Sequence, residues 1–117
     1  MSKMQRTKGM AGEREIARII AELTGWQVKR RVRQYEGDSD LEGVPGWAIE
    51  VKRAANPNLG PWWRQTVEQA TRAGVMPVLF YRIDRGPWRA VWPISATVAG
   101  VGEAWLDWQF AVTGSPE

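Results

Sequence analysis

The chain has 117 residues and a mass of 13.2 kDa, and we expect residues 1–117 to form a single domain. It contains no Cys and no His, which excludes disulfides, thiol nucleophiles, His-bearing metal sites and Ser-His-Asp triads. The net charge of +3 is uneven, because residues 1–33 carry nine Lys or Arg against three Glu, so this basic third is either a polyanion-binding surface or a solvated face.

The first predicted element is a helix over residues 11–24, preceded by a basic and flexible arm over residues 1–9. Apolar residues recur at helical spacing from Ile16 to Leu23, and Gly25 supplies a stop. Glu13 lies on the same stripe, one turn before the apolar residues. A carboxylate on the core-facing stripe needs a partner or a function, unless it is a first-turn Glu that interacts favourably with the helix dipole.

A strand is predicted over residues 26–33, with Val28, Arg30 and Val32 on one face. Arg30 therefore either reaches a functional site or extends its charged end past the valines to solvent. The acidic residues 34–40 predict a turn, and residues 41–46 predict a short strand or turn that ends at Pro-Gly.

The next strand, over residues 47–53, is the most informative segment. Its apolar side chains Trp47, Ile49 and Val51 share one face, so by alternation Glu50 and Lys52 project together from the other. An acid and an ammonium are thus predicted side by side on one regular strand.

The second predicted helix begins at Pro61 and ends near Ala73. Trp63, Val67 and Ala70 form its apolar stripe, with Gln65, Gln69 and Arg72 on an adjoining polar stripe. Strands follow over residues 75–83 and 88–94 around a turn at 84–87. The segment 95–117 is compatible with a short helix or a strand around residues 104–112.

Seven of the eight Trp residues fall into two predicted groups. Trp26, Trp47 and Trp92 are expected in the core. The candidates for a subunit interface or for stacking on unpaired bases are Trp62, Trp63, Trp105 and Trp108.

Asp40, Glu50 and Lys52 form the candidate site. Two carboxylates brought together repel each other unless a cation lies between them. Oxygen ligands favour Mg²⁺ or Mn²⁺, which take one or two carboxylates together with a substrate phosphate. Lys52 beside such an ion could orient or deprotonate the attacking water, or stabilise charge on a phosphate.

The order Asp40, Glu50, Lys52 resembles the PD-(D/E)XK nuclease motif. The resemblance is narrower to archaeal-type Holliday-junction resolvases and their phage relatives, and it covers residues 8–83. It is carried by Lys8-Gly9, Glu13-Arg14-Glu15, Gly25-Trp26, Arg30, Asp40-Leu41, Ile49-Glu50-Val51-Lys52, Gly74 and Pro77-Val78.

The resemblance implies a restriction-endonuclease-like α/β fold, a central mixed sheet flanked by helices in the order α-β-β-β-α-β. It implies that Glu13, Asp40 and Glu50 bind Mg²⁺ or Mn²⁺ and that Lys52 assists the water. In the family the motif Asp follows Pro, but Ser39 stands here, so Asp38 is an alternative ligand to Asp40. The residues implied or expected to contact DNA are Lys3, Arg6, Lys8, Arg14, Arg30 and Gln65, the last of which is otherwise a solvated helix residue.

The expected function is a metal-dependent, structure-selective DNA endonuclease that acts as a homodimer on a four-way junction. The alternatives are a nuclease of the same fold with a restriction, nicking or repair substrate, and a DNA-binding module in which Glu50 and Lys52 form only an ion pair. The basic N-terminus and the absence of a long apolar run predict a soluble, cytoplasmic protein, in a prokaryote or a phage-infected cell.

Overall fold

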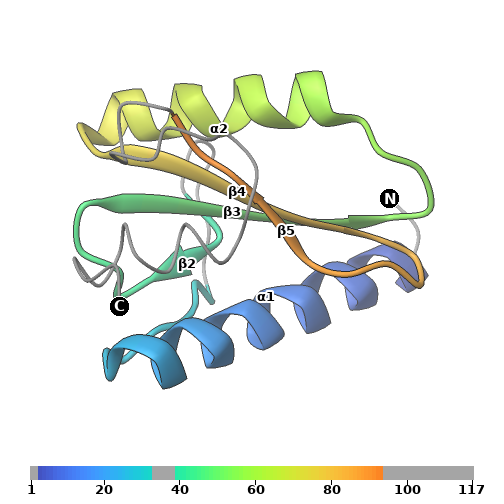
Figure 1. Ribbon diagram of the computed structural model, residues 1–117, viewed down its shortest axis with the longest axis horizontal. Coiled ribbons are helices and arrows are strands. Elements are labelled where there is room, and N and C mark those ends of the chain that lie inside the picture. The colour runs from blue at the N-terminus through green and yellow to red at the C-terminus, as the bar shows by residue number, and fades with distance from the viewer. Residues whose placement is uncertain (1–2, 33–38, 94–117) are drawn as a thin grey trace.

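The computed structural model describes residues 3–32 and 39–93, with side chains from Lys8 onward. Helices α1 and α2 cover opposite faces of a sheet of order β3-β4-β5 (Figure 1). The elements are α1 (Lys3–Thr24), β1 (Lys29–Arg30), β2 (Leu41–Glu42), β3 (Trp47–Ala54), α2 (Leu59–Ala73), β4 (Met76–Ile83) and β5 (Arg89–Val91). The expected α/β class, mixed sheet and element order are confirmed, and the strand predicted over residues 88–94 is present as β5.

The sheet is mixed because α2 connects two parallel strands. β3 and β4 pair in parallel from Trp47–Met76 to Ala54–Ile83, and a crossover helix is the usual connection for parallel neighbours. β5 then pairs antiparallel with β4. The short β1–β2 hairpin is also antiparallel and lies beside β3 on the side away from β4.

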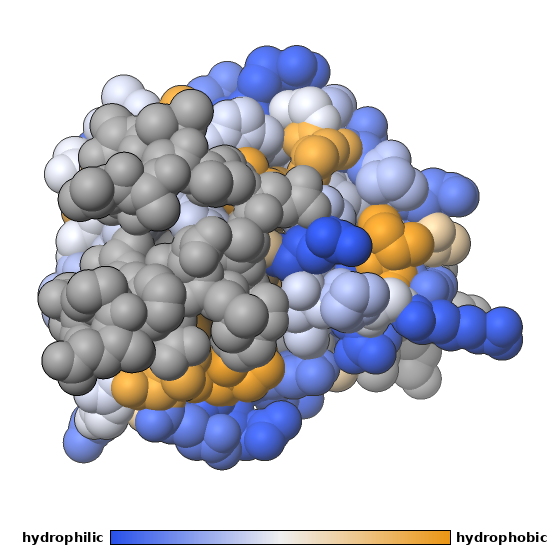
Figure 2. Space-filling model, in the orientation of Figure 1, coloured by the Kyte–Doolittle hydropathy of each residue, from blue (hydrophilic) through white to orange (hydrophobic). Residues whose placement is uncertain are grey.

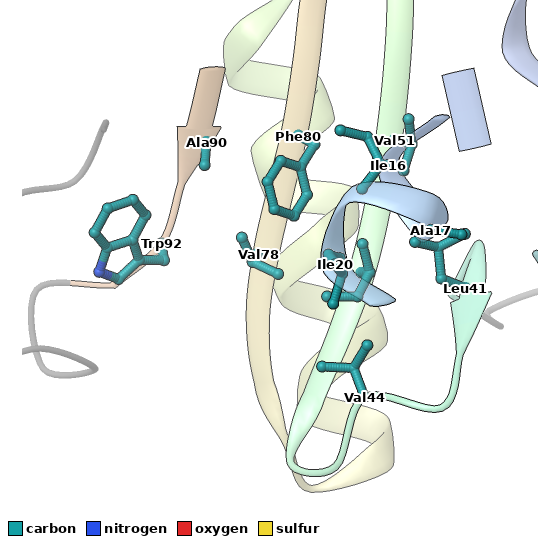
Figure 3. Packing of buried hydrophobic residues seen from close by; sticks show 11 residues of the cluster. Ile16, Ala17, Ile20, Leu41, Val44, Val51, Val78, Phe80, Ala90 and Trp92 are labelled. Carbon is teal, nitrogen blue, oxygen red and sulfur yellow. The ribbon is translucent and has the colours of Figure 1, made fainter. Parts of the chain in front are cut away.

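The main core lies between α1 and the sheet (Figure 3). Ile16 and Ile20 of α1, at helical spacing, pack with Ile49 of β3 and with Val78 and Phe80 of β4. The core also takes in Trp92, which is fully buried, and Trp26 and Trp47 pack partly buried against it, as expected. The outer faces of α2 and α1, at the top and bottom of Figure 2, are largely hydrophilic. Among the described residues, neither helix combines the length and hydropathy of a membrane span.

Three sequence expectations differ from the structure. α1 begins at Lys3 rather than at residue 11, so residues 3–9 are helical where an arm was expected. The strand expected over 26–33 is paired only at Lys29–Arg30, and Val32 is 84% exposed instead of facing the core. Gln69, expected on a polar stripe, is buried because this side of α2 packs on the sheet. Residues 95–117, with Trp105 and Trp108, lie outside the described part.

Gly12 allows α1 to approach the sheet closely. A Cβ on Gly12 would lie 2.9 Å from Cδ of Arg53 and 3.2 Å from Cη2 of Trp88, whereas a Cβ on Gly9 would meet nothing within 4 Å. Helix propensity alone favours Ala over Gly by about 1 kcal/mol at both positions.

We therefore expect Gly9→Ala to stabilise the protein by up to about 1 kcal/mol, and Gly12→Ala to lose this gain and destabilise by about 1 kcal/mol. Urea unfolding of the two variants, which differ only in position along one helix, measures the difference. Equal stabilisation by both substitutions would contradict close packing at Gly12.

Candidate active site

Alternation along β3 separates its side chains into two sets. Ile49 and Val51 join the core against α1, so Glu50 and Lys52 project from the opposite face, on the side where α2 packs. Lys52 Nζ lies 3.4 Å from Glu50 Oε2. The Glu50 side chain is 3% exposed and the Lys52 side chain 28%, so the ion pair extends from the interior toward solvent. The predicted acid and ammonium pair is therefore present.

Asp40 is fixed to the free edge of β3 by two backbone contacts. Its own N–H donates to the Ile49 carbonyl at 2.9 Å, and the Val51 N–H donates to its Oδ2 at 2.8 Å. These contacts are made with the residues before and after Glu50, so Asp40 is held beside Glu50. Its side chain is nearly as buried as that of Glu50.

Arg31 holds the chain around Asp40, a role that the sequence reasoning missed. Its Nε donates to the Ser39 carbonyl at 3.0 Å and its Nη2 donates to the Leu41 carbonyl at 3.3 Å, so the guanidinium bridges both neighbours of Asp40. Its Nη1 lies 3.6 Å from Glu42 Oε2. The only signal in the sequence is a basic run that precedes an acidic one, which does not identify this residue.

Gly43 permits the turn that leads from β2 back to β3. Its φ of +97° lies in the left-handed region, which favours glycine. A Cβ at this position would also collide with the Gln27 carbonyl oxygen. The hairpin that carries Asp40 therefore requires glycine here.

Glu13 approaches the site from α1 and is paired with Arg30. Arg30 Nε donates to Glu13 Oε1 at 3.0 Å, and both side chains are largely buried, at 22% and 12% exposed. The carboxylate on the core-facing stripe thus has a partner on β1. Arg30 points toward α1, which accounts for its place beside Val28.

The negative charge of Asp40 acts on both other carboxylates of the site, Glu50 and Glu13. Burial and the negative charge of Asp40 raise the pKa of Glu50 to about 8, with Lys52 opposing the rise. Burial and the same charge raise the pKa of Glu13, opposed by Arg30 and then by Lys52. The four predicted residues of the site, Glu13, Asp40, Glu50 and Lys52, therefore lie within electrostatic reach of one another.

The donor set fits a divalent cation in two respects. Glu50 Oε1 is buried and has no hydrogen-bond partner, so an acceptor stands unsatisfied next to Asp40. Burial and then the negative charge of Asp40 raise the pKa of Glu50, and a cation between the two carboxylates would offset both effects. Within the described ranges, no three acidic side chains lie close enough together to hold a metal ion, since Glu13 is directed to Arg30.

The predicted DNA-contacting residues are spread over the molecule. Arg14 is exposed on α1 and Gln65 is exposed on α2. Lys8 forms an ion pair with Asp84 at 2.9 Å, on the turn between β4 and β5. Asp38 and the side chains of Lys3 and Arg6 lie outside the described part of the chain.

Comparisons with known proteins identify the family and the fold. The model of the family described as Phage putative PDDEXK endonuclease matches residues 4–109. The fold is similar to the solved structure of Hjc from Archaeoglobus fulgidus, described as a Holliday junction resolvase from an archaeal hyperthermophile. The two chains are 22% identical with a TM-score of 0.55, over 82% of this chain and 80% of that chain. No curated protein matches the sequence.

Proposed function

The chain belongs to the family of phage putative PDDEXK endonucleases, and from this premise we propose that it is a metal-dependent endonuclease selective for four-way DNA junctions. One observation carries the proposal of a working site. Asp40 is held by the backbone of β3 beside the Glu50–Lys52 pair, so the three motif residues converge. The fold that the chain shares with a junction resolvase supports the choice of substrate.

We propose that Asp40 and Glu50 hold a Mg²⁺ or Mn²⁺ ion, with Glu13 as the third predicted ligand. A bound ion would supply a Lewis acid that lowers the pKa of a coordinated water. The oxygens available for it include Glu50 Oε1, while Asp40 Oδ2 remains bonded to the Val51 N–H. Glu13 can bind the ion only if its hydrogen bond and ion pair with Arg30 break.

Lys52 is proposed to act on the attacking water or on the phosphate. Its ammonium is partly exposed and lies 3.4 Å from Glu50, so it can contact a phosphodiester that approaches from solvent. There it would orient the water or stabilise negative charge on the phosphate. Arg14 and, once released from Glu13, Arg30 would contact neighbouring phosphates.

We further propose that the protein acts as a two-fold homodimer, since two sites related by two-fold symmetry suit two strands of one junction. Asp38 remains the alternative to Asp40 as ligand.

The decisive test compares a labelled four-way junction with a linear duplex of the same sequence, in Mg²⁺, in Mn²⁺ and in EDTA. We expect junction cleavage in either metal, at least about tenfold faster than duplex cleavage, and none in EDTA. Equal cleavage of the duplex would reject the junction preference and favour a restriction, nicking or repair substrate. DNA binding without cleavage in either metal would favour a non-catalytic DNA-binding module.

A further inference from the structure

Arg53 differs from the other half-buried arginines of the described chain. Arg30 bonds Glu13, Arg31 bonds two carbonyls and Glu42, and Arg82 bonds the Gly86 carbonyl at 2.7 Å and lies near a carboxylate. Within residues 8–32 and 39–93, Arg53 has neither a hydrogen bond nor an ion pair, and its Nε is buried without a partner. The guanidinium charge of this half-buried residue therefore has no counter-charge among these residues, which favours an anionic ligand.

The aliphatic part of Arg53 is fixed in place. Gly12 leaves the space that its Cγ and Cδ fill, and Trp88 closes the same contact from the sheet side. Trp88 Nε1 is likewise buried without a partner. Two unsatisfied N–H donors therefore belong to side chains that meet at Gly12. A stem held in this way leaves the guanidinium little conformational freedom to lose on binding an anion.

The charges around Arg53 also favour an anion. It is in register with Arg82 of β4, and like charges opposite each other in a sheet repel. The charge of Arg82 is offset by Glu15, 3.8 Å away. Lys8 is offset by Asp84 at the adjoining turn. Arg53 is therefore the uncompensated cation of this group.

We infer that Arg53 binds a backbone phosphate of the DNA substrate through the terminal nitrogens of its guanidinium, with its stem positioned by Gly12 and Trp88. This inference rests on the proposed function, because DNA supplies the phosphate. Arg53 directly follows Lys52 on β3, and by alternation its side chain projects to the α1 face with Ile49 and Val51, so the phosphate would lie on the α1 side of the strand that carries Glu50 and Lys52. Arginine recognises phosphate oxygens by charge-assisted hydrogen bonds.

The experiment compares wild type, Arg53→Gln and Arg72→Gln in binding to a four-way junction, by fluorescence anisotropy in EDTA over a range of salt concentrations. Arg72 is the matched control: an exposed arginine in the last turn of α2 without an ion pair among the described residues. We expect Arg53→Gln to weaken binding about tenfold and to lower the slope of log K against log salt by about one. Arg72→Gln should leave both unchanged.

Unfolding midpoints separate a phosphate contact from a structural role. Arg53→Gln should be at least as stable as wild type, since it removes an unpaired charge. An unchanged salt slope, with or without a loss of stability, would overturn the inference. Failure of the nuclease proposal would give a different result. Wild type would then not cleave DNA with Mg²⁺ or Mn²⁺, while Arg53→Gln would still lower the salt dependence of binding.

Discussion

Asp40→Asn is expected to lower junction cleavage by on the order of 10³-fold, about 4 kcal/mol of transition-state stabilisation, with junction binding retained. The amide oxygen of Asn can still accept the Val51 N–H, so the edge of β3 keeps its geometry. What is lost is the charge that would bind the metal beside Glu50. Single-turnover cleavage in saturating Mg²⁺, with anisotropy for binding, measures both quantities.

Two further substitutions sharpen this result. Lys52→Ala should lose cleavage to a similar extent and also retain binding, because it removes the ammonium and leaves both carboxylates. Asp38→Asn is the comparison for the choice of ligand and should leave cleavage close to that of wild type. If Asp38→Asn abolished cleavage and Asp40→Asn did not, the assignment of Asp40 would be wrong.

The second large effect concerns stability, and it arises from Glu50. Its pKa is about 8 in the folded protein and near 4.5 in the unfolded chain. Between these values the folded state holds a proton that the unfolded state has released, so folding stability falls as pH rises from about 4.5 to 8. The shift corresponds to at most about 5 kcal/mol.

Glu50→Gln removes this titration. In the metal-free protein, we expect the variant to be more stable than wild type at pH 8 by several kcal/mol and to show a flatter stability profile from pH 5 to pH 8. Urea unfolding in EDTA across this range measures the effect. Asp84→Asn, which makes the same change from carboxylate to amide at an exposed position, is the matched control. Parallel profiles for wild type and Glu50→Gln would contradict a protonated Glu50.

The same variant tests the proposed metal site. Mg²⁺ or Mn²⁺ should stabilise wild type more strongly at pH 8 than at pH 6, because binding requires Glu50 to release its proton. Neither ion should stabilise Glu50→Gln to the same degree. Equal stabilisation of both proteins would place the ion away from Glu50.

The parts of the site that could be predicted from sequence are those fixed by local periodicity. The position of Glu50 with Lys52 on one face follows from the two-residue repeat of a strand, and the helical repeat of α1 places Glu13 on the stripe that faces the core. The motif order and family resemblance then supplied the fold, which the family match and the solved structure confirm.

The remaining features depend on contacts between segments distant in sequence. Glu13 pairs with Arg30 on another element, and Lys8 pairs with Asp84 far along the chain. Lys8 lies in the part of α1 where a flexible arm was expected. No local pattern shows that Arg53 would lack a partner. The prediction that Val32 faces the core was wrong because alternation predicts burial only while a strand continues to pair, and pairing ends at Arg30.

The bond from the Val51 N–H to the carboxylate of Asp40 has a further consequence. Val51 belongs to the free edge of β3, where a regular sheet would place the carbonyl of another strand, and a side-chain oxygen takes that position instead. An unpaired edge is a template for pairing with other chains. The residue proposed to hold the metal thus also occupies the position at which another strand could pair with Val51, so loss of this side chain would expose the edge as well as remove a ligand.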